Sequence, residues 1–169
     1  KSLIKFSKIK KSPIFIDLII SNKKKAKGLL YGHQFHIKSK ILDFKNIKNT
    51  EKKLLTFLVK NKIKLICLAG FMSILSKSFI KKFDGKIINI HPSLLPKYKG
   101  INTHNKAIKN KDKFSGCTVH YVTEKLDSGR IIMQKKVKIT KKDTSTTLAK
   151  KILKQEHKLY PKAILKIFS

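Results

Sequence analysis

The pattern of hydrophobic and polar positions along the chain changes between two periods. Short runs rich in β-branched residues, such as residues 14–21 and 63–69, are bounded by Pro, Gly or charged positions, which is typical of buried strands. Residues 50–60 instead place large apolar side chains at helical spacing, behind a candidate cap at Thr50. In chain order we expect a strand at 14–21, helices at 26–31 and 50–60, a strand at 63–69, a helix at 76–83 and a strand at 86–91. Strands and helices that alternate at this spacing predict right-handed βαβ units and a parallel sheet.

The pattern changes after Pro92. The expected elements are then a loop at 93–102, a helix at 104–109, strands at 116–123 and 130–140, and a helix at 146–168 that is capped by Asp143-Thr144-Ser145 and kinked or divided at Pro161. The short segment between the two strands predicts an antiparallel hairpin at a sheet edge. The predicted fold is therefore α/β: a single Rossmann-like domain over residues 1–169, with a mostly parallel sheet flanked by helices and an antiparallel edge hairpin.

The formal net charge of +32 introduces an alternative class, a basic nucleic-acid-binding module. Nucleic-acid interfaces favour arginine, because the guanidinium makes bidentate contacts with phosphates and bases. Here Arg130 is the one arginine among 41 basic residues, and the lysines are spread along the whole chain. We therefore interpret the charge mainly as a solvated lysine surface that also attracts anionic substrates, and we expect no specific nucleic-acid partner.

The cysteines and the apolar runs bear on the compartment. Cys67 and Cys117 lie in separate strand-like runs and form no CxxC motif, which is typical of small core residues in a reducing compartment. No apolar run approaches the ~20 residues that a membrane-spanning helix needs. Residues 1–5 do not begin a signal peptide. We expect a cytoplasmic protein, monomer or homodimer, with no membrane partner.

Candidate chemistry begins at the end of the strand at 86–91. Asn89 and His91 are two residues apart, so their side chains leave the strand on the same face. They also stand at its carboxyl end, where open α/β sheets bind their ligands. On spacing alone, the pair could equally finish the strand with hydrogen bonds into the next loop. The loop at 92–100 favours a functional site, because it places two prolines and a glycine directly over the strand end.

These residues resemble a known family, the folate-dependent formyltransferases. Residues 89–96, Asn-Ile-His-Pro-Ser-Leu-Leu-Pro, match the first part of the family signature, and residues 126–129, Leu-Asp-Ser-Gly, match the second. The resemblance runs from about Phe15 to the C-terminus. Residues 97–104, 116–120 and 155–161 are similar to the branch that formylates 5′-phosphoribosylglycinamide in purine synthesis. The branch that acts on methionyl-tRNA would continue differently after the signature. A formyltetrahydrofolate hydrolase remains the nearest alternative.

The resemblance implies that Asn89, His91 and Asp127 are catalytic. Attack of an amine on a formyl carbon creates an oxyanion, for which the Asn89 amide and a protonated His91 are suitable donors. Asp127 would hold the imidazole and favour its charged form. His91 or a bound water would move the proton from the amine to the folate nitrogen. Without the motif at 89–91, Asp127 would be interpreted as an ordinary turn aspartate.

The resemblance also implies binding residues. The co-substrate would be 10-formyltetrahydrofolate, with no metal. Its pocket would comprise Met72, Ser73, Ile74, Leu75, Asn89, Val122 and Leu126. Glu156, Ile90 and Pro92 would contact the ribonucleotide, and Lys45 or Lys48 would replace an arginine that the family uses near the folate tail. Glu156 could instead be a solvated helix charge, and His104, His120 and His157 are expected to be structural.

The sequence departs from the family at its start. Family members begin with a strand and a Gly-x-Gly-Ser-Asn loop, whose backbone N–H groups hold the ribonucleotide phosphate at a helix N-terminus. Residues 1–11 resemble the helix that follows that loop, and the loop itself is not in the sequence. We expect the chain to be a fragment that lacks this strand and phosphate loop, and to continue past Ser169 in the whole protein.

Overall fold

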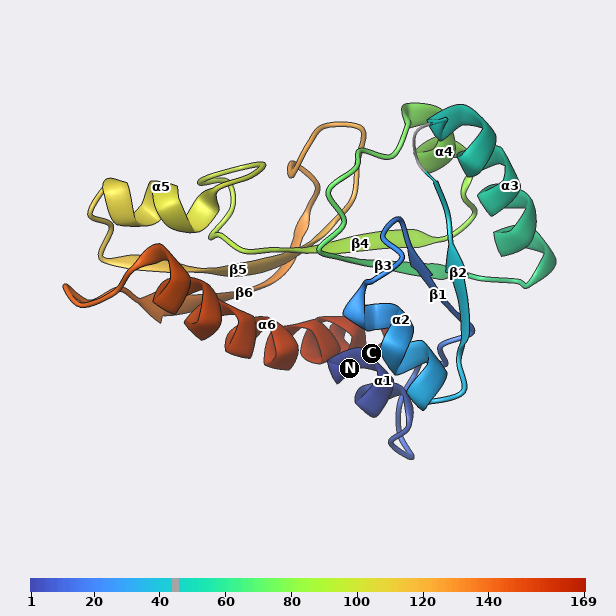
Figure 1. The fold of residues 1–169 in the computed structure, drawn as a ribbon, viewed down its shortest axis with the longest axis horizontal. Coiled ribbons are helices and arrows are strands. Elements are labelled where there is room, and N and C mark those ends of the chain that lie inside the picture. The colour runs from blue at the N-terminus through green and yellow to red at the C-terminus, as the bar shows by residue number, and fades with distance from the viewer. Residues whose placement is uncertain (44–45) are drawn as a thin grey trace.

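The computed structural model describes residues 1–43 and 46–169 (Figure 1). Its elements are α1 (Ser2–Ser7), β1 (Leu18–Ser21), α2 (Lys27–Gln34), β2 (Lys38–Ile41), α3 (Ile47–Lys60), β3 (Leu65–Ala69), α4 (Lys77–Lys82), β4 (Lys86–His91), α5 (Thr103–Lys109), β5 (Phe114–Tyr121), β6 (Ile131–Lys138) and α6 (Ser145–Phe168).

The strands form two sheets. β1 and β2 pair in parallel, and a second sheet has the order β3-β4-β5-β6. Within it β3 and β4 are parallel, whereas β4–β5 and β5–β6 are antiparallel. The α/β class and the antiparallel hairpin are thus confirmed. Within the described residues, β1, β2, β3 and β6 each have one edge that pairs with no strand.

Alternation along β4 separates the two faces of the larger sheet. Ile88 and Ile90 point into a core cluster that includes Leu148, Ile152 and Ile164 of α6. Ile87 points into a second cluster with α3 and α4. Because side chains alternate along a strand, Asn89 and His91 share the face of Ile87. The core therefore presents these two polar side chains on the side away from α6.

The first strand is shorter and less buried than predicted. Residues 14–21 were expected to be a buried strand, but β1 covers only Leu18–Ser21, its side chains are half-buried, and Phe15 is 81% exposed. Among the described residues, β1 pairs with a strand on one side only, which leaves its other edge uncovered by the sheet. β2 was not predicted, because its sequence Lys-Ser-Lys-Ile is exposed throughout and carries no hydrophobic period.

The observed start of α3 differs from the predicted one, whereas the observed bounds of α6 agree with the prediction. α3 begins earlier than expected, because Asn46 and not Thr50 caps it by accepting from the backbone N–H of Asn49 at 3.2 Å. Thr144 caps α6 in a reciprocal arrangement with Thr147, as expected. α6 is one continuous helix through Pro161, so the prediction of a division there is wrong. The hydroxyl of Ser2 donates to the carbonyl of His157, which lost its helical donor to Pro161.

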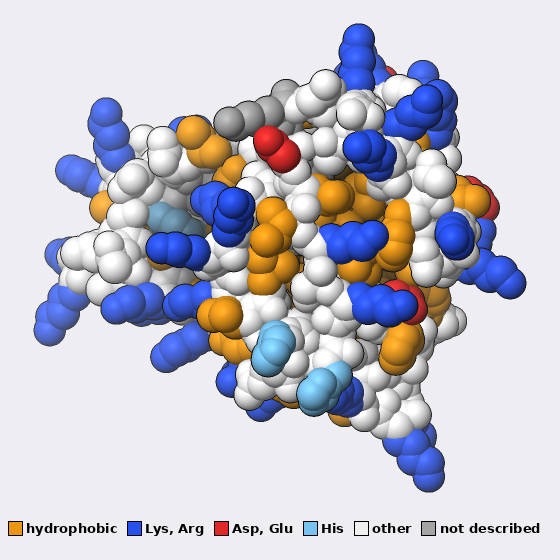
Figure 2. Space-filling view, turned by 45° about the vertical axis from the view of Figure 1, so that its right-hand side comes forward, with side chains coloured by type: hydrophobic (Ala, Val, Ile, Leu, Met, Phe, Trp, Pro, Cys, Tyr) orange, Lys and Arg blue, Asp and Glu red, His pale blue; other side chains and the backbone are white. Residues whose placement is uncertain are grey.

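Lysine side chains cover the surface without gathering in one stripe on the face drawn in Figure 2, and hydrophobic side chains gather between them near its centre. Both chain ends lie beside α1 and the last turns of α6 in Figure 1. In the described part of the chain, no helix combines the length and apolar character that a membrane crossing requires.

Candidate active site

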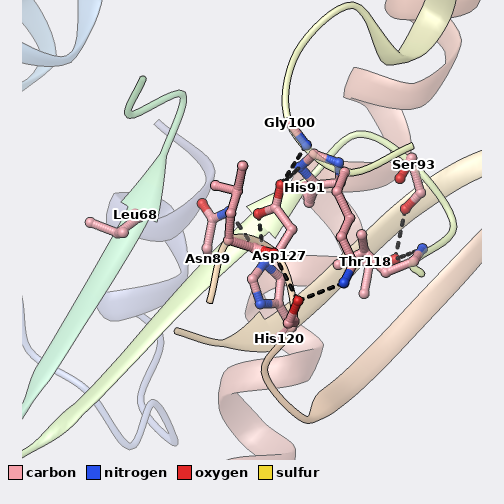
Figure 3. A network of polar contacts seen from close by, with 12 residues as sticks. Leu68, Asn89, His91, Ser93, Gly100, Thr118, His120 and Asp127 are labelled. Atoms are coloured by element: carbon pink, nitrogen blue, oxygen red, sulfur yellow. Dashed lines mark hydrogen bonds and ion pairs between the residues drawn. The ribbon is translucent and has the colours of Figure 1, made fainter. Parts of the chain in front are cut away.

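Four polar side chains converge at the end of β4 (Figure 3). Asn89 and His91 come from β4, His120 from β5, and Asp127 from the segment between β5 and β6. Asp127 lies between the two histidines: its Oδ2 is 3.4 Å from Nδ1 of His91, and its Oδ1 is 3.5 Å from Nε2 of His120. The side chains of His91, Asp127 and His120 are 6%, 7% and 3% exposed, so water screens their charges weakly.

Asp127 is held by the backbone of the neighbouring loop. Its Oδ2 accepts from the N–H of Gly100 at 2.8 Å. Asp127 itself has a φ of 45°, in the left-handed region, which a non-glycine residue adopts at a cost. Gly129 follows so close to the backbone of Tyr121 that a β-carbon would not fit there. The turn at Asp127 is therefore fixed by contacts with the Gly100 and Tyr121 backbones, beyond the ordinary preference of aspartate for turns.

The ring of His91 is oriented by two acceptors. Its Nε2 lies 2.8 Å from the carbonyl oxygen of Tyr98. A carbonyl only accepts, so Nε2 carries a hydrogen and Nδ1 is the nitrogen that faces Asp127. Asn89, His91 and Asp127 are thus brought together as the sequence predicted, with Asp127 beside the imidazole.

His120 was expected to be structural, but the structure places it in this cluster. Its Nδ1 donates to the carbonyl of Tyr121 at 2.8 Å, which leaves Nε2 to accept from the Asn89 amide at 3.3 Å. Burial lowers the pKa of His120, although Tyr121 and Asp127 oppose this effect. We conclude that His120 is neutral at pH 7 and fixes the Asn89 side chain with its Nδ2 toward the ring.

Strand register explains why His120 lies there. β4 and β5 are antiparallel, with Asn89 opposite His120 and His91 opposite Thr118. The pairing of β5 with β6 shifts between Val119 and His120, and such irregularities re-aim side chains beside functional sites. Apart from the resemblance over residues 116–120, the sequence signal was the alternation of His120 with Thr118, which becomes informative once the register is known.

Thr118 anchors the loop that follows β4. Its hydroxyl donates to the carbonyl of Ser93 at 2.7 Å and accepts from the N–H of Leu95 at 3.1 Å. Gln134 on β6 donates to the carbonyl of Leu95 at 2.8 Å. Thr118 and Ser93 are fully buried. The loop over the strand end is therefore rigidly attached to the sheet that carries Asn89 and His91.

The predicted folate residues fall into three groups by exposure. Met72, Ile74 and Leu126 are 73%, 66% and 53% exposed, so their apolar side chains are available to a ligand. Leu75 is buried in the core with α3 and α4, where it does not face solvent. Ser73 and Val122 are half-buried.

The side chains of the predicted ribonucleotide residues differ in where they lie. Burial raises the pKa of Glu156 to about 7. Glu156 lies on α6 near Cys117, which packs into the α6 side of the sheet, opposite to Asn89. Ile90 is also buried in that core, so its side chain is not available to a substrate, and Pro92 is half-buried at the strand end.

The remaining expectations concern the folate tail and metals. Lys48 is exposed on α3, and Lys45 lies outside the described residues. Among the residues that the structure describes, His, Cys, Asp and Glu do not gather in any group that could hold a metal ion. His104 is half-buried, and burial together with the nearby His91 lowers its pKa.

The architecture and the site define a class: an α/β protein with an Asn–His–Asp cluster, in which the His and Asp side chains are buried, at the carboxyl end of a central strand. Residues 3–164 match the family model described as Formyl transferase, and the chain belongs to this family.

Named relatives agree with this assignment. The chain is 39% identical over 167 residues to the human trifunctional purine biosynthetic protein adenosine-3; the match covers 97% of the chain and 16% of that protein. It is 41% identical over 155 residues to phosphoribosylglycinamide formyltransferase of Haemophilus influenzae, which covers 90% of the chain and 73% of the relative. The crystal structure of phosphoribosylglycinamide formyltransferase from Anaplasma phagocytophilum superposes with a TM-score of 0.90 at 42% identity, covering 96% of this chain and 77% of the other.

Proposed function

We propose that the chain transfers a formyl group from 10-formyltetrahydrofolate to the amine of 5′-phosphoribosylglycinamide in purine (IMP) synthesis. The observation that carries the proposal is the buried contact of Asp127 with His91, beside Asn89, at the carboxyl end of β4. The names of the bacterial relatives support the same reaction. The amine nitrogen would bond to the formyl carbon, the bond from that carbon to the folate nitrogen would break, and a proton would pass from the amine to that nitrogen.

Asn89 is the best-placed donor for the oxyanion. One hydrogen of its Nδ2 is used by His120, and the second is free to bind the formyl oxygen as negative charge develops. A donor held in advance costs no reorganisation during the reaction. Mutations of such donors in other enzymes lower kcat by about 10²–10³-fold.

His91 and Asp127 would contribute to the reaction through charge and proton transfer. In the observed geometry both ring nitrogens of His91 face protein acceptors, so its role is to place a positive charge beside the oxyanion when protonated. The 3.4 Å separation between Nδ1 and Asp127 is long for a charged hydrogen bond, which leaves the Nδ1 hydrogen able to shift toward a substrate oxygen or a water. This arrangement supports proton transfer through His91.

The formyl-folate would bind against the exposed apolar side chains next to this cluster. Met72 and Ile74 belong to the loop between β3 and α4, and Leu126 immediately precedes Asp127. Apolar walls with a few polar groups are typical of cofactor-sized ligand sites. A pterin held between these side chains would bring its formyl group toward Asn89.

The ribonucleotide would reach the cluster across the end of β4, past Pro92, with Glu156 near its amine. A carboxyl whose pKa is about 7 accepts a hydrogen bond from a neutral amine without requiring it to be protonated, which keeps the amine nucleophilic. Glu156 would hold the substrate from the α6 side of the strand end, while the amine reaches the formyl carbon beside Asn89.

The test is an assay of the protein with both substrates. With the family's N-terminal strand and phosphate loop added to the chain, we expect formylated product, and a fall in kcat of about 10²-fold or more for Asn89→Ala and Asp127→Asn in the same background. Asp84→Asn, at an exposed turn on the far side of β4, is the matched control and should retain activity. Formate release without the amine substrate would instead indicate a hydrolase. Unchanged turnover in both site variants would contradict the proposed site.

A further inference from the structure

Tyr98 adopts a costly backbone conformation directly beside the candidate active site. Its φ is 56°, in the left-handed region that favours glycine, and a bulky residue there costs roughly 1–2 kcal/mol. Such a conformation persists only when the surroundings impose it. Its consequence is visible at His91, because this backbone turn directs the Tyr98 carbonyl to Nε2 of His91 at 2.8 Å.

The side chain of Tyr98 is fixed at its far end. Its hydroxyl donates to Oδ2 of Asp112 at 2.8 Å and accepts from Nδ2 of Asn110, also at 2.8 Å. Asp112 is held in turn by Lys97, whose Nζ lies 2.7 Å from Oδ1, and the Asp112 side chain is only 12% exposed. The ring of Tyr98 packs against the larger core cluster. Asn110 and Asp112 follow α5, and no proposed role in substrate binding or catalysis involves them.

A second contact fixes the backbone on the other side. The hydroxyl of Ser93, which is fully buried, donates to the carbonyl of Lys97 at 2.5 Å and lies 3.3 Å from the carbonyl of Tyr98. The peptide that carries the His91 acceptor is thus held by its own side chain and by the start of the loop. Neither constraint touches His91 itself.

We propose that Tyr98 is a positioning residue whose side chain, clamped by Asp112 and Asn110, holds the carbonyl that keeps the hydrogen of His91 on Nε2 and leaves Nδ1 to face Asp127. The inference rests on the proposed function only for its effect on turnover, since the choice of tautomer is a property of the free protein. A neutral imidazole carries its hydrogen on either nitrogen, and a fixed acceptor selects one. If the carbonyl moves, the hydrogen can occupy Nδ1 and bind Asp127, and the ring loses its defined orientation.

The other polar groups around His91 do not place the hydrogen of the neutral ring on Nε2. Asp127 approaches from the turn after β5, His120 lies beyond it on β5, and His104 approaches from α5. Asp127 alone would favour a hydrogen on Nδ1, because a carboxylate is the stronger acceptor. The Tyr98 carbonyl is therefore the group that opposes Asp127 in the neutral ring.

The experiment compares the full chain with its Tyr98→Phe and Asp112→Ala variants. The ring nitrogens are detected by NMR in protein that carries ¹⁵N-labelled histidine, at an alkaline pH at which the His91 ring is neutral. The spectrum of His91→Asn identifies the His91 signals. We expect the Nε2–H tautomer in the natural chain and a mixture that includes Nδ1–H in both variants. Tyr31→Phe, on α2 beside the smaller sheet, is the matched control and should leave the His91 signals unchanged.

Turnover gives a second measurement. We expect kcat to fall about tenfold in Tyr98→Phe and Asp112→Ala with KM for both substrates unchanged, because the ring and not the binding surface is altered. A single Nε2–H tautomer in both variants, or the Nδ1–H tautomer in the natural chain, would overturn the proposal. A tautomer change in a chain that transfers no formyl group would support the positioning role and contradict the proposed function alone.

Discussion

The hydroxyl of Ser2 donates to the carbonyl of His157, four residues before Pro161 in α6. Proline has no N–H, so this carbonyl has no partner within its helix, and a residue from α1 supplies the donor. One hydrogen bond therefore satisfies the carbonyl that Pro161 leaves without a donor, and it also attaches α1 to α6.

Removing this donor should weaken both elements. We expect Ser2→Ala to lower the free energy of unfolding by about 1 kcal/mol, the usual net value of one hydrogen bond. Urea unfolding followed by circular dichroism measures the change. Ser78→Ala, at an exposed position of α4, is the control, and an equal loss there would remove the special role of Ser2.

Glu51 is a buried acid whose carboxylate caps a helix from outside it. Ser76 caps α4 by accepting from the N–H of Phe79, and Glu51 on α3 accepts from the Ser76 N–H at 2.7 Å and from its hydroxyl. In the common capping box, the residue three positions after the cap performs this second task, but here that residue is Phe79. Glu51 thus joins α3 to α4 at the end of the loop that carries Met72 and Ile74.

Glu51→Ala should therefore cost about 1–3 kcal/mol in unfolding free energy, because a buried N–H loses its acceptor. Glu124→Ala is the comparison: Glu124 pairs with Lys77 and Lys81 at the surface, and such pairs contribute only about 0–1 kcal/mol. Chemical denaturation of both variants measures the two losses of unfolding free energy. Similar losses would mean that the carboxylate of Glu51 has no special capping role.

Glu156 should make stability depend on pH. Its pKa rises from 4.5 to about 7 in the folded chain because of burial, so between these values the folded chain holds a proton that the unfolded chain has lost. Stability contributed by this proton is present at low pH and declines as pH rises through about 7. Glu156→Gln removes the titration and should be more stable than the natural chain at pH 8, by about 1–3 kcal/mol.

The comparison has an internal control. Below the unfolded pKa of 4.5 both forms of residue 156 are neutral in both states, so the difference between variant and natural chain should level off there. Urea unfolding over a series of pH values measures the difference directly. A difference that does not change with pH would contradict a raised pKa for Glu156.

His120 should control activity at acid pH. Its neutral Nε2 accepts from Asn89, and protonation would place two donors against each other and disturb the amide. Because burial lowers the pKa of His120, activity should persist to lower pH than an ordinary histidine would allow and then fall. His120→Phe should lower kcat by about tenfold, because the amide loses its acceptor.

His120→Asn separates the acceptor role from the titration. The asparagine offers an acceptor that does not titrate, so it should recover part of the activity, and the loss of kcat that His120 causes at low pH should disappear. The measurement is kcat as a function of pH for the three proteins. Equal activity of His120→Phe and the natural chain would show that Asn89 needs no support from this ring.

The sequence predicted the elements well where local signals were strong. β4 was predicted to the residue, because an apolar run lies between Gly85 and Pro92. β2 was missed, since its four exposed residues gain their strand structure only by pairing with β1. Thr50 was predicted as the α3 cap because it directly precedes the apolar positions, whereas Asn46 caps the helix in the structure.

For the site, the motif located Asn89, His91 and Asp127 but not their surroundings. His120 enters through the register of β4 and β5, which alternation within one strand does not determine. The acceptor for His91 is a backbone carbonyl, which every residue has, so the sequence carries no mark of it. Glu156 was identified by resemblance, and its raised pKa depends on packing against the sheet.

Open strand edges bear on how the described chain behaves at high concentration. β1, β2, β3 and β6 each have one edge without a strand partner among the described residues, and an open edge can pair with another chain. A net charge of +32 opposes such encounters by repulsion between copies. Salt shortens the range of that repulsion to about 3 Å at 1 M, so light scattering should show self-association that grows with ionic strength. The repulsion between lysine-covered surfaces would then keep copies of the chain apart although strand edges are open.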